Sequence, residues 1–169
     1  ETHLKRISKG QAPRKPDGHR VEPAVSDEQK EDIDSAGYKC TDSIRIPGTQ
    51  PDGRDVVFVN QDVIPVAPSH LVFLLRLAGE LVRCRGGWVK RQQLIDEGVV
   101  TADGYNQRIS EVRKAIGPYL AKHNPRGFIE NRSKEYRIST HPDFVTYDKA
   151  RLLKHPENTI RKLARKLPR

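Results

Sequence analysis

Apolar residues concentrate between residues 55 and 140, and their spacing divides this stretch into short elements. Two β-branched runs, at 56–59 and 63–66, flank the polar turn Asn60-Gln61-Asp62. Such runs around a three-residue turn predict a β-hairpin. Pro65 confines the second strand to an edge or a strand end, because proline cannot donate to a neighbouring strand. Residues 37–46, ahead of this hairpin, contain strand-forming residues as well.

Helical spacing follows the hairpin. Leu and Ala recur at that spacing over residues 71–82, behind Pro68, which is favoured in a first helical turn. Gly86-Gly87 ends this helix, and a short second helix is expected at about residues 89–97.

A third helix and a second hairpin complete the pattern. Tyr105, Ile109, Val112 and Ile116 form one apolar stripe on a helix of about residues 103–116. Two apolar runs around a polar, basic turn then predict a hairpin over residues 128–138. The order of strands, three helices and a hairpin predicts an α+β fold of the winged helix-turn-helix type. It comprises an N-terminal antiparallel β-sheet, three helices, a C-terminal wing hairpin and an extra C-terminal helix.

Four pieces of the chain also match a known family in order and spacing. They are VFVNQDVIPVAPSHLVFLLRLA (57–78), GGWVKRQQLI (86–95), YNQRISEVRKAI (105–116) and FIENRSKEYRI (128–138). With these pieces the chain resembles the winged-helix effector domain of OmpR-type bacterial response regulators, without their receiver domain. The resemblance implies that helix 103–116 reads a DNA major groove and that wing 128–138 reaches the minor groove.

The chain departs from the family pattern at several positions. Ala67 stands where the family has a capping Thr and offers no side-chain cap. Ser133 and Glu135 replace both wing glycines, so the wing turn is expected to be built differently. The link between the second and third helices is short, which puts the family's contact with RNA polymerase in doubt.

Charge divides the chain into three parts. Residues 1–20 carry a net charge of +4 and residues 21–35 a net charge of -5, with few apolar residues, so 1–35 is expected to be a disordered tail. Residues 36–140 carry +5 and form the expected DNA-binding domain. Residues 141–169 form a basic helical extension, in which Ile160, Leu163 and Leu167 lie on one face. That helix could lie along DNA, dock on the domain, pair with a partner or bind an anionic membrane surface.

The candidate DNA-binding residues lie on the third helix, the wing and the start of the second helix. Arg pairs with guanine, Asn and Gln pair with adenine, and Glu accepts from cytosine. For each group, the alternative is that the charged side chains are simply solvated and do not contact DNA. The candidates are Lys90, Arg91, Asn106, Gln107, Arg108, Ser110, Glu111, Arg113, Lys114, Arg132 and Lys134. Trp88 and Tyr136 are expected in the core, and stacking on a base is the alternative for Trp88.

Other classes of function find no support in the residues. The six histidines and two cysteines lack metal-ligand spacing, and neither a nucleophile–base pair nor a phosphate loop is present. We therefore expect no enzyme, no metal and no cofactor. No apolar run is long enough to cross a bilayer, and two cysteines fit a reducing cytoplasm. The absence of Met, even at position 1, suggests a fragment or processed chain.

These observations predict a cytoplasmic, nucleoid-associated protein that binds specific sequences of double-stranded DNA and regulates transcription, with a homodimer as a candidate state. The alternatives are a winged-helix protein-interaction adaptor and a nucleic-acid-binding protein of a mobile element without a regulatory role. The C-terminal helix and the acidic segment 21–35 are candidate sites for a protein partner.

Overall fold

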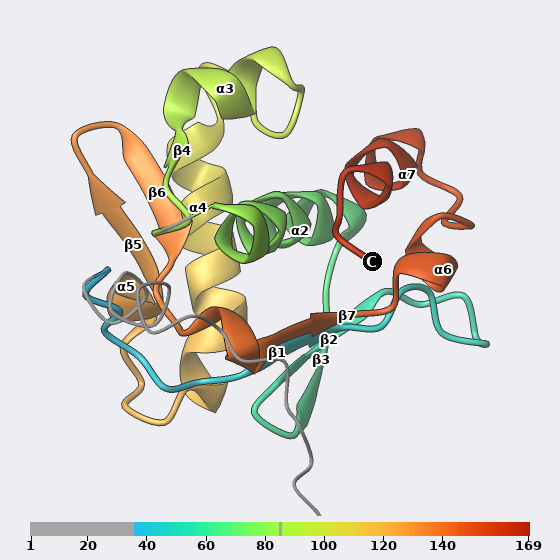
Figure 1. The fold of residues 1–169 in the computed structure, drawn as a ribbon, viewed down its shortest axis with the longest axis horizontal. Helices are drawn as coiled ribbons and strands as arrows, with labels where there is room; N and C mark the ends of the chain where they lie inside the picture. Colours follow the sequence, from blue (N-terminus) through green and yellow to red (C-terminus); the bar gives the residue numbers. More distant parts are fainter. Residues whose placement is uncertain (1–35, 85) are drawn as a thin grey trace, which may run out of the picture.

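A computed structural model gives the structure of residues 36–84 and 86–169. It is an α+β fold, and the order of its elements can be followed in Figure 1. The tail expected at residues 1–35 lies outside the described residues. No helix of the described part is both long enough and apolar enough to cross a membrane.

The strands and helices have the following bounds. The strands are β1 (Ile44–Ile46), β2 (Val56–Val59), β3 (Asp62–Pro65), β4 (Val89–Lys90), β5 (Ile129–Arg132), β6 (Glu135–Ile138) and β7 (Val145–Tyr147). The helices are α2 (Pro68–Arg83), α3 (Arg91–Asp96), α4 (Tyr105–Ile116), α5 (Pro125–Phe128), α6 (Lys149–Leu152) and α7 (Asn158–Arg165), with the 3-10 turns η1 (Gly117–Tyr119) and η2 (Pro142–Phe144). The two hairpins and the three helices expected from the sequence are thereby confirmed. The first turn is shorter than predicted, because Asp62 pairs with Val59 and leaves only Asn60 and Gln61 between the strands.

The first sheet corrects one prediction. Its strand order is β3-β2-β1-β7, and β7 pairs with β1 in parallel, so the sheet is mixed and not wholly antiparallel. Only its first three strands form the expected antiparallel meander. β7 has three residues, and the short link from β6, which contains η2, brings it beside β1 in the same direction. Val145 is buried there opposite Ile44.

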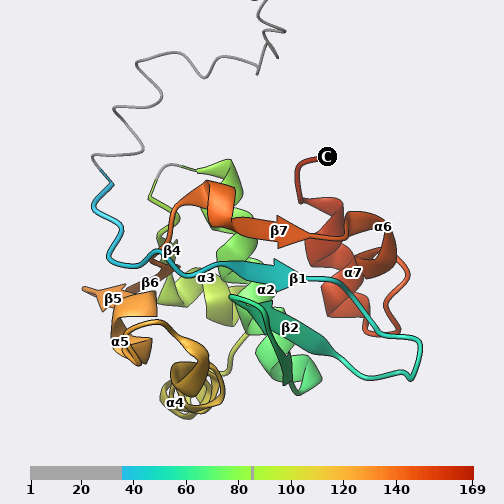
Figure 2. The ribbon, with the colours of Figure 1, turned by 90° about the horizontal axis from the view of Figure 1, so that it is seen from below.

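Helix α2 lies at the centre of the molecule. Every residue from Leu71 to Gly79 is buried, so the helix has no solvent-facing side along this stretch. The first sheet covers one side of α2, and its inward residues Ile44, Val57 and Ile64 are buried (Figure 2). Strand β6 and helix α7 contact other sides of α2. A helix that is apolar around its circumference is stable only in such surroundings.

One buried charge on α2 is fully paired. Arg76 is 7% exposed and donates from Nε and Nη2 to both carboxylate oxygens of Glu97, at 2.6 and 3.2 Å. Its Nη1 donates to Glu80 at 2.7 Å. A two-pronged pair of this kind compensates the cost of removing a guanidinium from water. The pair also ties α2 to the residue that follows α3.

The C-terminal residues belong to the same core as the rest of the fold. Ile160, Leu163 and Leu167 are buried, and α7 packs on α2. A Cβ atom at Gly79 would lie 3.2 Å from Leu167, so glycine allows this close approach. Of the four alternatives for the C-terminal helix, docking on the domain is the one observed. The boundary expected at residue 140 therefore separates residues that share one core.

The packing of α7 predicts a large cost for truncating its apolar face. Leu163→Ala removes a buried side chain, and we expect the free energy of unfolding to fall by about 2–4 kcal/mol, the range typical of Leu→Ala in a core. Urea unfolding followed by circular dichroism measures it. Lys162→Ala, on the exposed face of the same helix, is the matched control and should change stability by less than about 0.5 kcal/mol. Equal effects of the two changes would contradict the docking of α7.

The ion pairs of Arg76 with Glu80 and Glu97 predict that the stability of the fold depends on pH. Burial alone would raise the pKa of Glu80, but hydrogen bonds from Arg76 and Cys84 outweigh it and lower the pKa below its usual value. A carboxyl group with a lowered folded-state pKa stabilises the fold above its unfolded pKa, about 4.3, and this stabilisation is lost as pH falls through the folded value. We therefore expect Glu80→Gln to be less stable than the parent chain at pH 7 and to lose less stability on acidification.

Urea unfolding at a series of pH values between about 7 and 3 tests this expectation. Asp103→Asn, which removes an exposed loop carboxylate, is the control. Parallel profiles for Glu80→Gln and the parent chain would show that Glu80 contributes nothing to the acid dependence.

Candidate nucleic-acid interface

Helix α4 has one buried face and one exposed face. Ile109, Val112 and Ile116 are buried, as the apolar stripe predicts. Of the predicted DNA-binding residues on α4, four are exposed; they are Asn106, Gln107, Ser110 and Lys114. These side chains are short or unbranched, and three of them offer both donors and acceptors. This face can therefore form hydrogen bonds with base edges or phosphates.

Two other predicted residues of α4 are held by the protein itself. Arg108 donates to the carbonyls of Ser69 and Val99, at 3.3 and 3.4 Å. Glu111 lies 2.9 Å from His70 and accepts from Gln107 at 3.0 Å. The hydrogen bonds from His70 and Gln107 lower the pKa of Glu111. These contacts brace α4 against the start of α2.

The start of α3 is connected to both α4 and the second hairpin. Lys90 is exposed in β4, directly before α3. The guanidinium of Arg91 donates to the Tyr105 hydroxyl at 2.8 Å and lies 4.6 Å from the centre of that ring. The backbone N–H of Arg91 donates to the carbonyl of Lys134 at 2.8 Å. Arg91 therefore fixes the spacing between three elements of the surface.

The second hairpin joins a three-stranded sheet of order β4-β6-β5. Its turn is formed by Ser133 and Lys134, whose φ angles are 36° and 65°. Positive φ at both central residues is typical of a type I′ turn, which normally uses Gly or Asn. The turn thus forms without glycine, at a conformational cost, and it presents the exposed Lys134 at the tip.

Trp88 supports the hairpin through two arginines. The guanidiniums of Arg132 and Arg137 lie 4.1 and 4.5 Å from its ring. Arg132 also pairs with Glu135 at 3.0 Å, and Arg137 is buried against Glu130 at 2.9 Å. We expected Trp88 in the core, and this prediction is wrong. The side chain is half-buried, and its ring contacts these two cations. Tyr136 is buried, as predicted.

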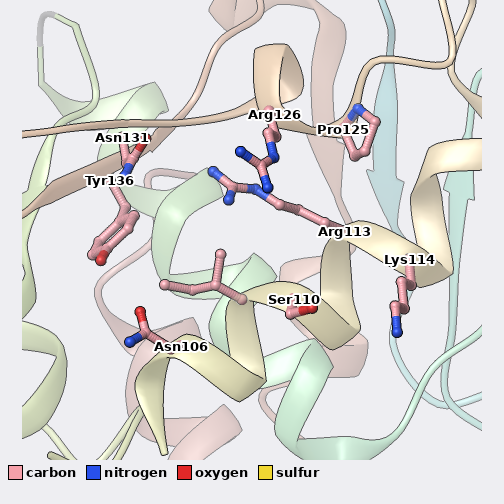
Figure 3. A pocket seen from close by; sticks show the side chains of 9 residues that line it. Asn106, Ser110, Arg113, Lys114, Pro125, Arg126, Asn131 and Tyr136 are labelled. Carbon is pink, nitrogen blue, oxygen red and sulfur yellow. The ribbon is translucent and has the colours of Figure 1, made fainter.

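A groove separates α4 from the hairpin and α5, and we call it the α4–hairpin groove. It has a volume of about 370 Å³. Its lining residues come from all three elements, as Figure 3 shows; they are Asn106, Ile109, Ser110, Arg113, Lys114, Pro125, Arg126, Asn131 and Tyr136. Within the described part of the chain no carboxylate lines it.

Arg113 is half-buried at the base of this groove. It donates from Nε and Nη2 to the carbonyl of Ile129 in β5, with Nε at 3.2 Å. Burial lowers the pKa of Arg113, and the positive charge of Arg126 lowers it further. The groove is therefore a place of uncompensated positive charge, with hydroxyl and amide groups around it.

Sequence reasoning missed two residues of the groove, Arg126 and Asn131. Arg126 lies in α5, where the Asn124 side chain accepts from the Gly127 N–H at 3.1 Å and Pro125 occupies the first turn. The pair Asn124-Pro125 is a helix-start signal that could have indicated α5. Asn131 lies on β5, and nothing local in the sequence indicates which face of the strand it occupies.

Comparison of the chain with protein-family models, with curated proteins and with solved structures gives no match. The surface is therefore interpreted from its own chemistry. Exposed Lys114 and Arg126 lie in the groove with amides and a hydroxyl. Exposed Lys90 and Lys134 lie near each other where β4 pairs with the second hairpin. Such a surface suits a polyanion that also offers hydrogen-bonding groups.

The contact between Trp88 and Arg132 can be measured by a double-mutant cycle. A partly exposed cation–π pair contributes about 0.5–1 kcal/mol. We expect Trp88→Leu and Arg132→Ala to show a coupling free energy in this range, from chemical unfolding of the two single variants and the double variant followed by circular dichroism.

Trp88→Leu combined with Arg45→Ala is the control pair, because Arg45 stacks on Phe58 in the other sheet. Additive effects of Trp88→Leu and Arg132→Ala would show that Trp88 does not stabilise the position of Arg132.

Proposed function

We propose that this chain binds double-stranded DNA as a winged-helix protein and regulates transcription through that binding. Helix α4 enters the major groove, and the β5–β6 hairpin acts as the wing at the neighbouring minor groove. The observation that carries the proposal is the α4–hairpin groove, which is basic, free of carboxylates among the described residues and flanked by an exposed polar helix face.

The arrangement of elements supports the proposal. Helices α2, α3 and α4 precede the hairpin, and β4 pairs with β6 to complete its sheet. In winged-helix proteins, elements in this order bring a recognition helix and a wing side by side. A major-groove helix needs a polar outward face, and α4 has one.

The contacts divide the predicted residues by role. Asn106, Gln107, Ser110 and Lys114 are the candidates for base contacts, because their side chains are exposed on α4. We assign Lys90 and Lys134, which lie close together where β4 meets the hairpin, to phosphate contacts, and Arg132 to the minor groove. Arg91, Arg108 and Glu111 hold the surface in shape through their own hydrogen bonds.

Binding to labelled duplex DNA, single-stranded DNA and RNA, measured by fluorescence anisotropy at two salt concentrations, tests the proposal. We expect the duplex to bind most tightly and its affinity to fall steeply with salt, because each phosphate contact contributes about 0.9 to the log–log slope. Tighter binding to RNA or to single strands would contradict the proposal.

One pair of variants locates the interface. We expect Lys114→Ala on α4 to weaken duplex binding about tenfold, the loss typical of one charge-assisted contact. Lys162→Ala, on the exposed face of α7, removes the same charge far from the hairpin (Figure 1) and should have a smaller effect. Equal losses would mean that overall charge and not the α4 surface determines the affinity.

A further inference from the structure

Two arginines share the α4–hairpin groove without an acidic partner. Figure 3 shows that the guanidinium groups of Arg113 and Arg126 point toward the same space, although one comes from α4 and the other from α5. Arg126 is exposed and makes no ion pair within the described part of the chain. Guanidinium groups keep their charge in proteins, so the two cations repel each other there.

The remaining groups of the groove are also suited to an anion. Arg113 donates from Nε and Nη2 to the Ile129 carbonyl, which fixes its plane, and its Nη1 makes no hydrogen bond within the described part of the chain. Ser110, Lys114 and Asn131 add a hydroxyl, an ammonium and an amide to the same lining. Two converging guanidiniums with such neighbours match the several acceptor oxygens of a phosphate.

We propose that Arg113 and Arg126 together hold a single phosphate diester of the DNA backbone. This inference rests on the proposed function. A DNA strand separates the major groove from the minor groove, so it must pass between a helix in the first and a wing in the second. The α4–hairpin groove lies at that position, and α5 supplies its second guanidinium.

The role of Arg113 follows from this geometry. A phosphate contact fixes the register of the protein on the duplex but carries no information about the sequence. Arg113 is therefore a positioning contact and not the base-reading residue that its place on the recognition helix suggests. Its loss affects all duplex sequences equally.

The salt dependence of duplex binding tests the shared phosphate. The variants are Arg126→Gln, the double variant Arg113→Gln/Arg126→Gln, and the control Arg45→Gln/Arg54→Gln, which removes two guanidiniums from β1 and the β1–β2 loop. On random duplex DNA we expect the double variant to lower the log–log slope by about 0.9, the value for one phosphate. Arg126→Gln should weaken binding about tenfold on every duplex, and the control should leave the slope unchanged.

Three results overturn the inference while leaving duplex binding intact. They are an unchanged slope in the double variant, a decrease of about 1.8 that indicates two separate phosphates, and a loss with Arg126→Gln confined to some sequences. Thermal unfolding of each variant shows whether it is folded. Should the double variant fail to fold, Arg126→Gln alone decides, because equal loss on all duplexes supports the inference and an unchanged affinity refutes it.

Failure of the proposed function gives a different result. A parent chain that does not bind duplex DNA refutes both statements. Titration with inorganic phosphate, followed by the NMR signals of the arginine side chains, then shows whether the pair binds a free phosphate. In one outcome the chain binds phosphate saturably without binding duplex DNA, and Arg126→Gln abolishes that binding. This result would assign the groove to a small phosphorylated ligand and overturn the DNA assignment.

Discussion

The fold depends on the complete burial of helix α2. Because residues Leu71–Gly79 have no exposed side, every other layer must remain in contact with this helix. This burial includes the charged Arg76, whose guanidinium is stable among apolar neighbours because it pairs with Glu80 and Glu97. The same ion pairs place the end of α3, and with it the loop that leads to α4. The burial of α2 at the centre of the fold thereby determines the position of the candidate interface.

The sequence is most informative where structure is set by neighbouring residues. The hairpin at residues 56–65 and the helices α2 and α4 follow from side-chain spacing over one or two turns, and they were predicted. The strands β4 and β7 have two and three residues and exist only because distant strands pair with them. No local pattern distinguishes such strands from loops.

The candidate site shows the same division. Periodicity is sufficient to find the outward face of α4, but it cannot show which polar residues on that face are already engaged. Arg108 and Glu111 bond to residues 39 and 41 positions away, near the start of α2. Arg126 was missed because α5 is four residues long and because only the folded chain brings Arg126 into the same groove as Arg113. The sequence therefore indicates the type of surface, whereas the tertiary contacts determine which side chains are engaged within the protein and which are exposed to a ligand.

The parallel pairing of β1 with β7 has a consequence for folding. Ile44 pairs with Val145, about a hundred residues later, so β1, an inner strand of the sheet, lacks one neighbour until β7 has been synthesised. Non-local pairing of this kind slows folding, since a long loop must close before the contacts form. During that interval β1 presents an open edge, which is the feature that favours association between unfinished chains. A cell that makes this protein rapidly would therefore need to protect its nascent chains.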